Sequence, residues 1–304
     1  MRMTLNDRLK RIATDRVLYL MLVPFLLYFI LFHYVPLIGN IIAFKRFTPA
    51  RGIVESPWVG FMYFRQFFAS TYFVRVLRNT VVISVSTLIV GFPAPIILAL
   101  MLNEVRHTAY KRVIQSVTYL PHFVSIVVVA GLIVQFSSAR GLFNDIIVAL
   151  GGTRAPLLLQ ARLFVPIYVS SEVWQTVGWG SIIYLSALST IDPNLYEAAV
   201  IDGAGRFRQL LAITLPCLVP TITVLFILRT GQLLSVGHEK IILLYNPLTY
   251  ETADVIMTFV YRKGLIDLSW SYSTAVGLLN SLVNGFVIIT VNAIARRVSD
   301  NSLW

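Results

Sequence analysis

Charged side chains are scarce in this 304-residue sequence, at 13% of the residues against about 25% in soluble domains. Acidic groups are the scarcest, with 14 Asp and Glu against 25 Lys and Arg, so the formal net charge is +11. Cysteine occurs once, as Cys217, which excludes a disulfide within the sequence. Hydrophobic residues make up 57%, and this composition excludes an ordinary soluble domain and predicts a protein surrounded mainly by lipid.

Motifs of catalysis and cofactor binding are also missing. The sequence has no Gly-x-x-x-x-Gly-Lys-[Ser/Thr] phosphate loop, so any ATP must be bound by another chain. The four histidines, at positions 33, 107, 122 and 238, are far apart and lack metal-ligand spacing. We therefore expect no catalytic residue, no metal site and no cofactor bound by this chain. The basic residues are scattered at loop edges, which favours contact with lipid phosphates over nucleic acid.

Six apolar runs each come close to the ~20 residues that span ~30 Å of hydrocarbon. The runs cover residues 17–44, 81–102, 117–136, 164–188, 218–236 and 275–295. This pattern predicts an all-α polytopic membrane protein with about six transmembrane helices, arranged as a single transmembrane domain over residues 1–304. Basic residues before the first run favour a cytoplasmic N-terminus, and six crossings return the C-terminus to the same side.

This topology assigns the segments between the spans to two sides of the membrane. The cytoplasmic segments are the N-terminal residues 1–16, loops at 104–113 and 189–216, and a tail at 296–304. The first outer loop covers residues 45–78, and the third covers residues 237–272. Basic residues are denser on the cytoplasmic side, in agreement with the positive-inside rule.

The loop at 189–216 is a polar interruption between two strongly apolar runs. Asp192 and Pro193 favour a turn, and Asn194 is placed to cap a following helix. Gly203 then permits a sharp change of direction before a second helix, which the Leu-Pro pair at its end should stop. From the pattern alone, these features fit either an amphipathic element at the membrane surface or a docking surface for a partner.

The same loop carries the pattern Glu-Ala-Ala, a Gly four residues later, and then an Ile and a Leu-Pro pair at fixed distances. It resembles the signature loop in membrane subunits of ATP-driven ABC importers. The resemblance implies that residues 194–216 form a coupling helix that inserts into a groove of a separate ATPase subunit. The coupling residues that it implies are Glu197, Ala198, Ala199, Asp202, Gly203, Phe207, Ile213, Leu215 and Pro216.

Further stretches resemble the LplB-like branch of carbohydrate-type permeases, which is related to the maltose and glycerol-phosphate permeases. They are Leu-Arg-Asn-Thr at 77–80, residues 91–100, Tyr-Leu-Pro-His-Phe-Val-Ser at 119–125, Leu-Tyr-Asn-Pro at 244–247 and Asn-Ser-Leu-Trp at 301–304. The sequence departs from that pattern at two places. Residues 60–64 read Gly-Phe-Met-Tyr-Phe instead of Gly-x-x-Asn-Phe, and residues 237–240 read Gly-His-Glu-Lys where Gly-Phe-acidic-Gln is more usual. The resemblance implies the type I ABC importer permease fold.

Ionisable residues inside the spans are costly to bury in lipid and usually face a cavity or a partner. Glu172 and Arg229 fall at similar depths, so they could form a buried ion pair or line a solute path. Neighbouring amides could hydrogen-bond sugar hydroxyls, and indole rings could stack on sugar rings. The candidates for the solute path are Glu172, Trp174, Gln175, Trp179, Arg229, Gln232, Asn280 and Asn284.

These features together predict a membrane subunit of an ATP-driven importer that passes an oligosaccharide or polysaccharide fragment from an external binding protein to the cytoplasm. The implied location is a bacterial cytoplasmic (inner) membrane, crossed several times. The implied partners are a second homologous permease subunit, two ATPase subunits that bind ATP and Mg, the external solute-binding protein and membrane lipid. The sequence leaves open whether the saccharide is acidic or neutral.

The alternative is an ion-coupled secondary transporter, which should show inverted repeats and midplane acids. No convincing repeat is present, and Glu172 is the one acid well inside a predicted span. Co-purification of a separate ATPase chain would distinguish the two classes.

Overall fold

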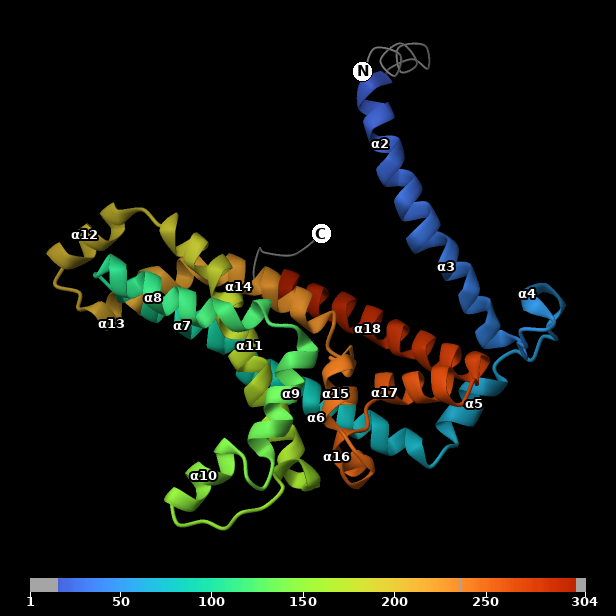
Figure 1. The fold of residues 1–304 in the computed structure, drawn as a ribbon. Coiled ribbons are helices and arrows are strands. Elements are labelled where there is room, and N and C mark those ends of the chain that lie inside the picture. The colour runs from blue at the N-terminus through green and yellow to red at the C-terminus, as the bar shows by residue number, and fades with distance from the viewer. Residues whose placement is uncertain (1–15, 236, 299–304) are drawn as a thin grey trace.

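The computed structural model describes residues 16–235 and 237–298, and this part of the chain is helical apart from turns, bends and an isolated bridge between Lys45 and Trp58 (Figure 1). The all-α prediction is confirmed for the described residues. Most of the predicted N-terminal segment, part of the tail and the stretch at 301–304 lie outside them. The main helices are α2 (Arg16–Phe29), α3 (Val35–Ile38), α4 (Gly52–Glu55), α5 (Met62–Phe68), α6 (Tyr72–Gly91), α7 (Pro93–Glu104), α8 (Thr108–Tyr119), α9 (Ile126–Ser137), α10 (Leu142–Ala149), α11 (Ala161–Ser189), α12 (Pro193–Ile201), α13 (Arg206–Gln209), α14 (Leu215–Thr230), α15 (His238–Leu244), α16 (Tyr250–Ala253), α17 (Ile256–Tyr261) and α18 (Trp270–Val298).

Five helical segments of the described chain are long and apolar enough to cross a membrane. They are Arg16–Phe44, Tyr72–Glu104, Ile126–Ala149, Arg206–Thr230 and Trp270–Arg297. The remaining predicted span corresponds to α11, whose 29 residues would extend over about 43 Å at 1.5 Å per residue. Polar side chains within α11 make it less apolar than the other five segments, although its length is sufficient.

The predicted span at 117–136 is interrupted in the structure. Helix α8 ends at Tyr119, a short 3-10 turn covers Leu120–Phe123, and α9 begins at Ile126. Pro121 lies in the turn and has no backbone N–H to continue an α-helix. The Ser125 side chain then caps α9 by accepting a hydrogen bond from the Val128 amide at 3.4 Å. The apolar residues before the turn therefore belong to a separate helix.

The fifth span starts earlier than predicted, because Pro216 does not end the preceding helix. Helix α13 continues through a π-helical turn, Leu210–Thr214, directly into α14. Within a regular α-helix the ring of Pro216 would clash with a carbonyl one turn back. The wider π turn lies at that position, and Pro216 falls in the first turn of α14, where a missing N–H is tolerated.

Helix α11 is the centre of the packing and contacts α6, α7, α8 and α14. A methyl group added to Gly178 would overlap the main chain at Thr118, so α11 and α8 approach each other closely at this position. Nearby, the ring of Pro95 in α7 packs against Gly180. Small residues at such crossings allow helices to pack in lipid, where no hydrophobic effect drives their association.

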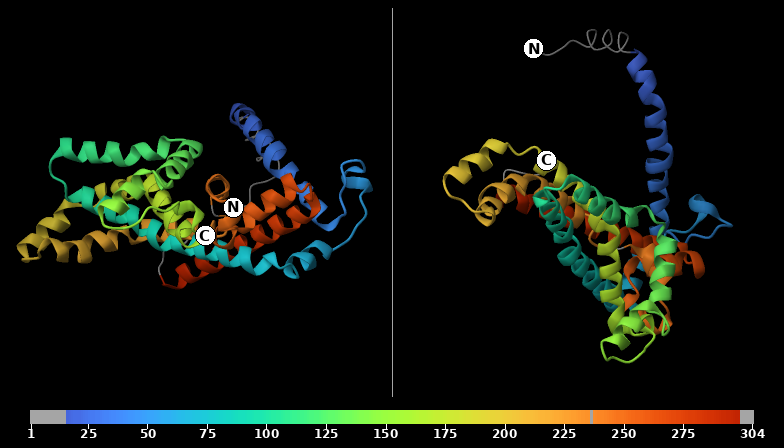
Figure 2. Two further views of the ribbon diagram at one scale, coloured as in Figure 1. Left: turned by 60° about the horizontal axis from the view of Figure 1, so that its bottom comes forward. Right: turned by 60° about the vertical axis from the view of Figure 1, so that its left-hand side comes forward.

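Helix α2 stands away from these packed helices in every view (Figures 1 and 2). None of its most apolar window is buried, so its contacts with the rest of the chain begin only toward residue 44. The α12–α13 hairpin lies at one end of the packed helices, and α5 and α17 lie toward the other end (Figure 1).

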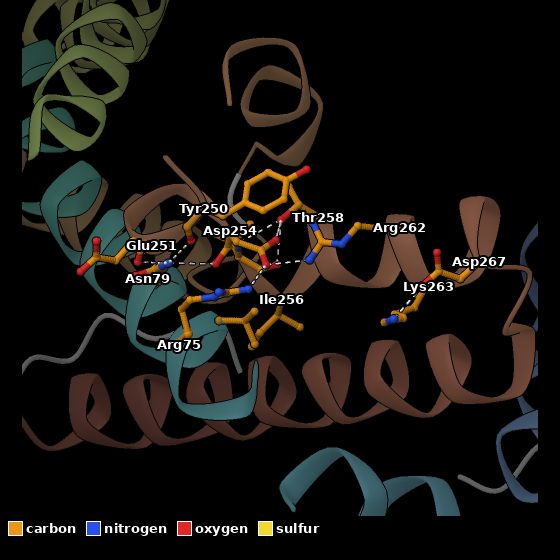
Figure 3. A network of polar contacts seen from close by, with 12 residues as sticks. Arg75, Asn79, Tyr250, Glu251, Asp254, Ile256, Thr258, Arg262, Lys263 and Asp267 are labelled. Carbon is orange, nitrogen blue, oxygen red and sulfur yellow. Dashed lines mark hydrogen bonds and ion pairs between the residues drawn. The ribbon is translucent and has the colours of Figure 1, made fainter. Parts of the chain in front are cut away.

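A polar network fastens the segment between α16 and α17 to α6 (Figure 3). The Asp254 carboxylate is fully buried and forms ion pairs with Arg262 at 2.7 Å and Arg75 at 3.2 Å. It also accepts a hydrogen bond from the Thr258 hydroxyl at 2.9 Å, while Asn79 donates to the Asp254 main-chain oxygen at 3.1 Å. Burial lowers the pKa of Arg262, but the hydrogen bond to Asp254, the Asp254 charge and the nearby Tyr245 and Tyr250 together raise that pKa by more, so the guanidinium stays charged.

Candidate coupling surface and solute cavity

The loop at 189–216 forms the predicted helix, bend and second helix. Asp192, not Asn194, caps α12, because the Asp192 carboxylate accepts a hydrogen bond from the Asn194 amide at 2.9 Å. Pro193 then occupies the first turn of α12, where its missing N–H costs nothing. The prediction placed the cap two residues too late because both residue types are good caps, and the fixed φ of Pro193 makes it the first helical residue.

Gly203 makes the bend as predicted. Its φ is +75°, in the left-handed region that favours glycine. The Gly203 amide donates to the Val200 carbonyl at 3.0 Å, and the Ala204 amide donates to the Ala199 carbonyl at 2.8 Å. This pair of bonds is the Schellman arrangement, which satisfies the last carbonyls of a helix and reverses the chain. Helix α13 can therefore run back from α12 after a link of four residues, 202–205.

The hairpin presents apolar side chains that nothing in the described chain covers. Ile201 is 86% exposed and Phe207 is 72% exposed. Such exposure at the end of a bundle is typical of an interaction surface. Of the nine predicted coupling residues, six are exposed: Glu197, Ala198, Asp202, Gly203, Phe207 and Pro216. Ala199, Ile213 and Leu215 are half-buried.

Two contacts connect the hairpin to the bundle. The hydroxyls of Tyr196 and Thr214 lie 2.9 Å apart and join α12 to the π turn before α14. Arg206 lies 3.9 Å from Glu104 at the end of α7, although both side chains are largely exposed. A displacement of the hairpin would therefore be transmitted to α14 directly, because α13 and α14 form one continuous helical segment.

A cavity of about 200 Å³ lies where α6, α11 and the end of α14 meet. Three of the predicted solute-path residues line it: Glu172, Arg229 and Gln232. Pockets for drug-sized ligands start at about 300 Å³, so this cavity suits one part of a longer molecule, such as a single sugar ring. The other lining residues are Ser84, Thr87, Leu88, Tyr168, Leu233, Ser235 and Gly237.

The cavity contains polar groups without partners. The hydroxyls of Ser84 and Thr87 are buried and have no hydrogen-bond partner among the described residues. They lie three positions apart on α6 and therefore share one face of that helix. An unpaired buried hydroxyl is unfavourable by about 1–3 kcal/mol.

Glu172 forms an ion pair with Lys240, so the pairing with Arg229 that the sequence suggested is not the one observed. The Lys240 ammonium lies 3.2 Å from the Glu172 carboxylate and 5.4 Å from the centre of the Tyr168 ring. The Lys240 side chain is 1% exposed, and burial lowers its pKa while Glu172 partly offsets that shift. Among the described residues Arg229 has no carboxylate partner, and its side chain is exposed where it lines the cavity.

The remaining solute-path candidates lie elsewhere. Trp174 lines a separate apolar cavity of about 500 Å³ between α9, α10 and α11, because it lies on the opposite side of α11 from Glu172. Trp179 stacks on His122 with ring centres 4.7 Å apart. Gln175 donates to the Val124 carbonyl at 3.5 Å.

The two asparagines of α18 are buried and do not line the cavity. Asn284 accepts a hydrogen bond from the Leu234 amide at 3.0 Å and donates to the Ser235 hydroxyl at 2.9 Å. It therefore holds the turn after α14 in place. Asn280 lies near the Met257 sulfur at 3.7 Å, and its side-chain oxygen has no partner among the described residues.

Lys240, Ser84 and Thr87 were not predicted as site residues. Lys240 is the one cation in the otherwise apolar stretch at 240–244, and it falls at a position already noted as a departure from related sequences. Ser84 and Thr87 carry the i, i+3 spacing of a polar stripe on an apolar helix. Among residues 16–235 and 237–298, no group of three or more His, Cys, Asp or Glu is placed to hold a metal ion.

A bundle of apolar helices with an exposed helical hairpin at one end and a polar cavity between the helices defines a membrane transport subunit. Residues 91–300 match the family described as "Binding-protein-dependent transport system inner membrane component". The chain belongs to this family. It is a multi-pass permease subunit of a carbohydrate ABC importer with the type I fold, and a non-catalytic component. This assignment supports the importer over the ion-coupled alternative.

Two relatives come from Bacillus subtilis (strain 168). Protein LplB is 46% identical over 291 residues, which cover 95% of this chain and 92% of LplB. The polygalacturonan/rhamnogalacturonan transport system permease protein YteP is 41% identical over 295 residues, covering 97% of this chain and 92% of YteP. The resemblance to the LplB-like branch is therefore confirmed.

The structure is also similar to a solved bacterial ABC transporter involved in the import of the acidic polysaccharide alginate. The TM-score is 0.90 at 45% identity, with 95% of this chain and 98% of that chain covered. A structure of a bacterial alginate ABC transporter in complex with an alginate pentasaccharide-bound periplasmic protein gives the same TM-score at 44% identity, over 97% of this chain and 99% of that chain.

Proposed function

We propose that this subunit carries acidic oligosaccharides, received from an external binding protein, across a bacterial cytoplasmic membrane. The observation that carries the proposal is Arg229, which faces the cavity without a carboxylate partner among the described residues. A guanidinium in such a site pairs readily with a carboxylate, because charge-assisted bonds are about twice as strong as neutral ones. A uronate unit supplies this carboxylate on the same ring as hydroxyls.

The other groups of the cavity suit the rest of a sugar ring. The amide of Gln232, which is exposed and lines the cavity, both donates and accepts hydrogen bonds, as sugar hydroxyls do. The substrates of two similar transport proteins agree with this class, since polygalacturonan, rhamnogalacturonan and alginate all contain uronic acids. The cavity is too small for a whole oligosaccharide, so the chain of sugars would pass it one unit at a time.

In this proposal ATP drives transport through the α12–α13 hairpin. Two ATPase subunits, which bind ATP and Mg, dock on this subunit and on a second, homologous permease subunit. Glu197 and the exposed apolar side chains of Ile201 and Phe207 support docking, because they form an uncovered patch around a rigid bend. Closure of the ATPases would move α13 and, through the continuous segment Arg206–Thr230, the cavity residue Arg229 at its far end.

Uptake into proteoliposomes that contain the assembled importer tests the solute assignment. The substrates are trigalacturonate and its methyl ester, which have the same sugars with and without charge. Because the binding protein is unchanged, a different acid-to-ester uptake ratio in a variant arises from the permease. We expect Arg229→Gln to lower trigalacturonate uptake by about tenfold or more, and ester uptake by less than about twofold.

Arg140→Gln is the matched control, because it removes an exposed arginine that does not line the cavity. It should leave both uptake rates unchanged. Equal losses of acid and ester uptake in the Arg229 variant, or no loss of either, would show that Arg229 does not bind the solute carboxylate.

A further inference from the structure

We propose that Lys240 sets the charge selectivity of the cavity without touching the solute. By pairing with Glu172, Lys240 prevents that carboxylate from occupying Arg229, so Arg229 remains available to an acidic sugar. This inference rests on the proposed function, and it adds a specificity-determining residue outside the cavity lining. Lys240 is a positioning residue in this scheme, because it acts through Glu172.

The charges around the cavity require a second cation to pair with Glu172 if Arg229 is to remain available. Among the described lining residues, Glu172 is the one acid and Arg229 the one cation. Alone they would cancel, and the carboxylate of Glu172 would compete with a solute carboxylate for the same guanidinium. Lys240 adds a positive charge behind the wall, so the cavity and its immediate support carry a net charge of +1.

The position of Lys240 allows it to pair with Glu172 but not to contact the solute. Its ammonium lies 3.2 Å from Glu172, and its side chain is 1% exposed, so a solute in the cavity cannot reach it. Helix α15 carries Lys240 and packs against α9, and Lys240 is not among the residues that line the cavity. The Tyr168 ring, which lines the cavity, covers the ammonium at 5.4 Å.

A purely structural ion pair would give a different result from a selectivity device. If the pair only stabilised the fold, its loss would lower uptake of acidic and neutral substrates equally. If the pair controls Arg229, loss of Lys240 alone would release Glu172 to bind Arg229 and would lower acid uptake selectively. Removing Glu172 as well would then restore acid uptake, because the competing carboxylate would be gone.

The experiment uses the assembled importer in proteoliposomes, with trigalacturonate and its methyl ester as substrates. We expect Lys240→Gln to lower the acid-to-ester uptake ratio by about tenfold. We expect the double variant Glu172→Gln/Lys240→Gln to return the ratio to within about twofold of the original protein. A ratio that is unchanged in the single variant, or still lowered in the double variant, would overturn the inference.

A second variant covers the case in which Lys240→Gln does not assemble. Gln232 is exposed and lines the same cavity, so Gln232→Glu introduces an unpaired acid beside Arg229 without burying a charge. It should lower the ratio to a similar extent, and an unchanged ratio would overturn the inference. The Arg229→Gln variant separates the two proposals: if it abolishes acid preference while the Lys240 and Gln232 variants do not, only the role of Lys240 is wrong.

Discussion

The buried carboxylate of Asp254 gives the sharpest prediction about stability. We expect Asp254→Asn to destabilise the subunit, because it removes the one negative charge that two guanidinium groups share in the Figure 3 network. The substituted amide keeps nearly the same shape and still offers an oxygen to Thr258. The loss is therefore electrostatic and leaves the packing unchanged.

The size of the destabilisation by Asp254→Asn follows from the exposure of each ion-pair partner. Removing one member of a buried ion pair destabilises a protein by about 3–5 kcal/mol. Asp254 is 0% exposed and Arg262 is 18% exposed, but Arg75 is 34% exposed and regains contact with water when the carboxylate is lost. The lower end of the range, about 3 kcal/mol, is therefore the expected loss in free energy of unfolding.

The matched control is Asp267→Asn, which removes an acid from the same region of the chain. Asp267 pairs with Lys263 at 2.7 Å, but both side chains are about a third exposed, so the pair contributes only about 0.3–0.5 kcal/mol. The measurement is the unfolding midpoint of the purified complex on titration with a denaturing detergent. Equal midpoints for the two variants would refute the idea that the Asp254 network holds α16 and α17 against α6.

Two other substitutions test the packing and the coupling surface. Gly178→Ala should prevent α11 from packing on α8 and lower the yield of folded protein, because the added methyl group meets the main chain at Thr118. Gly131→Ala is the control and should be tolerated, because its methyl group would enter open space. Equal yields of the two variants would contradict the close approach of α11 and α8. Phe207→Ala should reduce ATPase co-purification by about tenfold, as expected for an aromatic anchor. Phe68→Ala, in α5 toward the other end of the packed helices (Figure 1), should not reduce it. Retained ATPase in the Phe207 variant would argue against docking at the hairpin.

The hairpin shows how far local sequence signals reach. The bend at Gly203 was predictable because a left-handed φ favours glycine, and the structure places it there. The predicted stop at Pro216 was wrong. The ring of a proline clashes with the carbonyl one turn back when that turn is a regular α turn. The turn at Leu210–Thr214 is a π turn instead, and its last residue, Thr214, contacts the Tyr196 hydroxyl of another helix.

The helical class, most of the spans and the family were determined by the sequence, because burial in lipid requires long apolar runs and the signature loop has fixed spacing. Tertiary structure decided which polar residues meet. Glu172 and Arg229 share one cavity, but Lys240, from a short helix 68 residues beyond Glu172, takes the carboxylate. The depth of a residue in the membrane follows from its position along one helix. The choice of ion-pair partner depends instead on how several helices pack, which no single stretch of sequence determines.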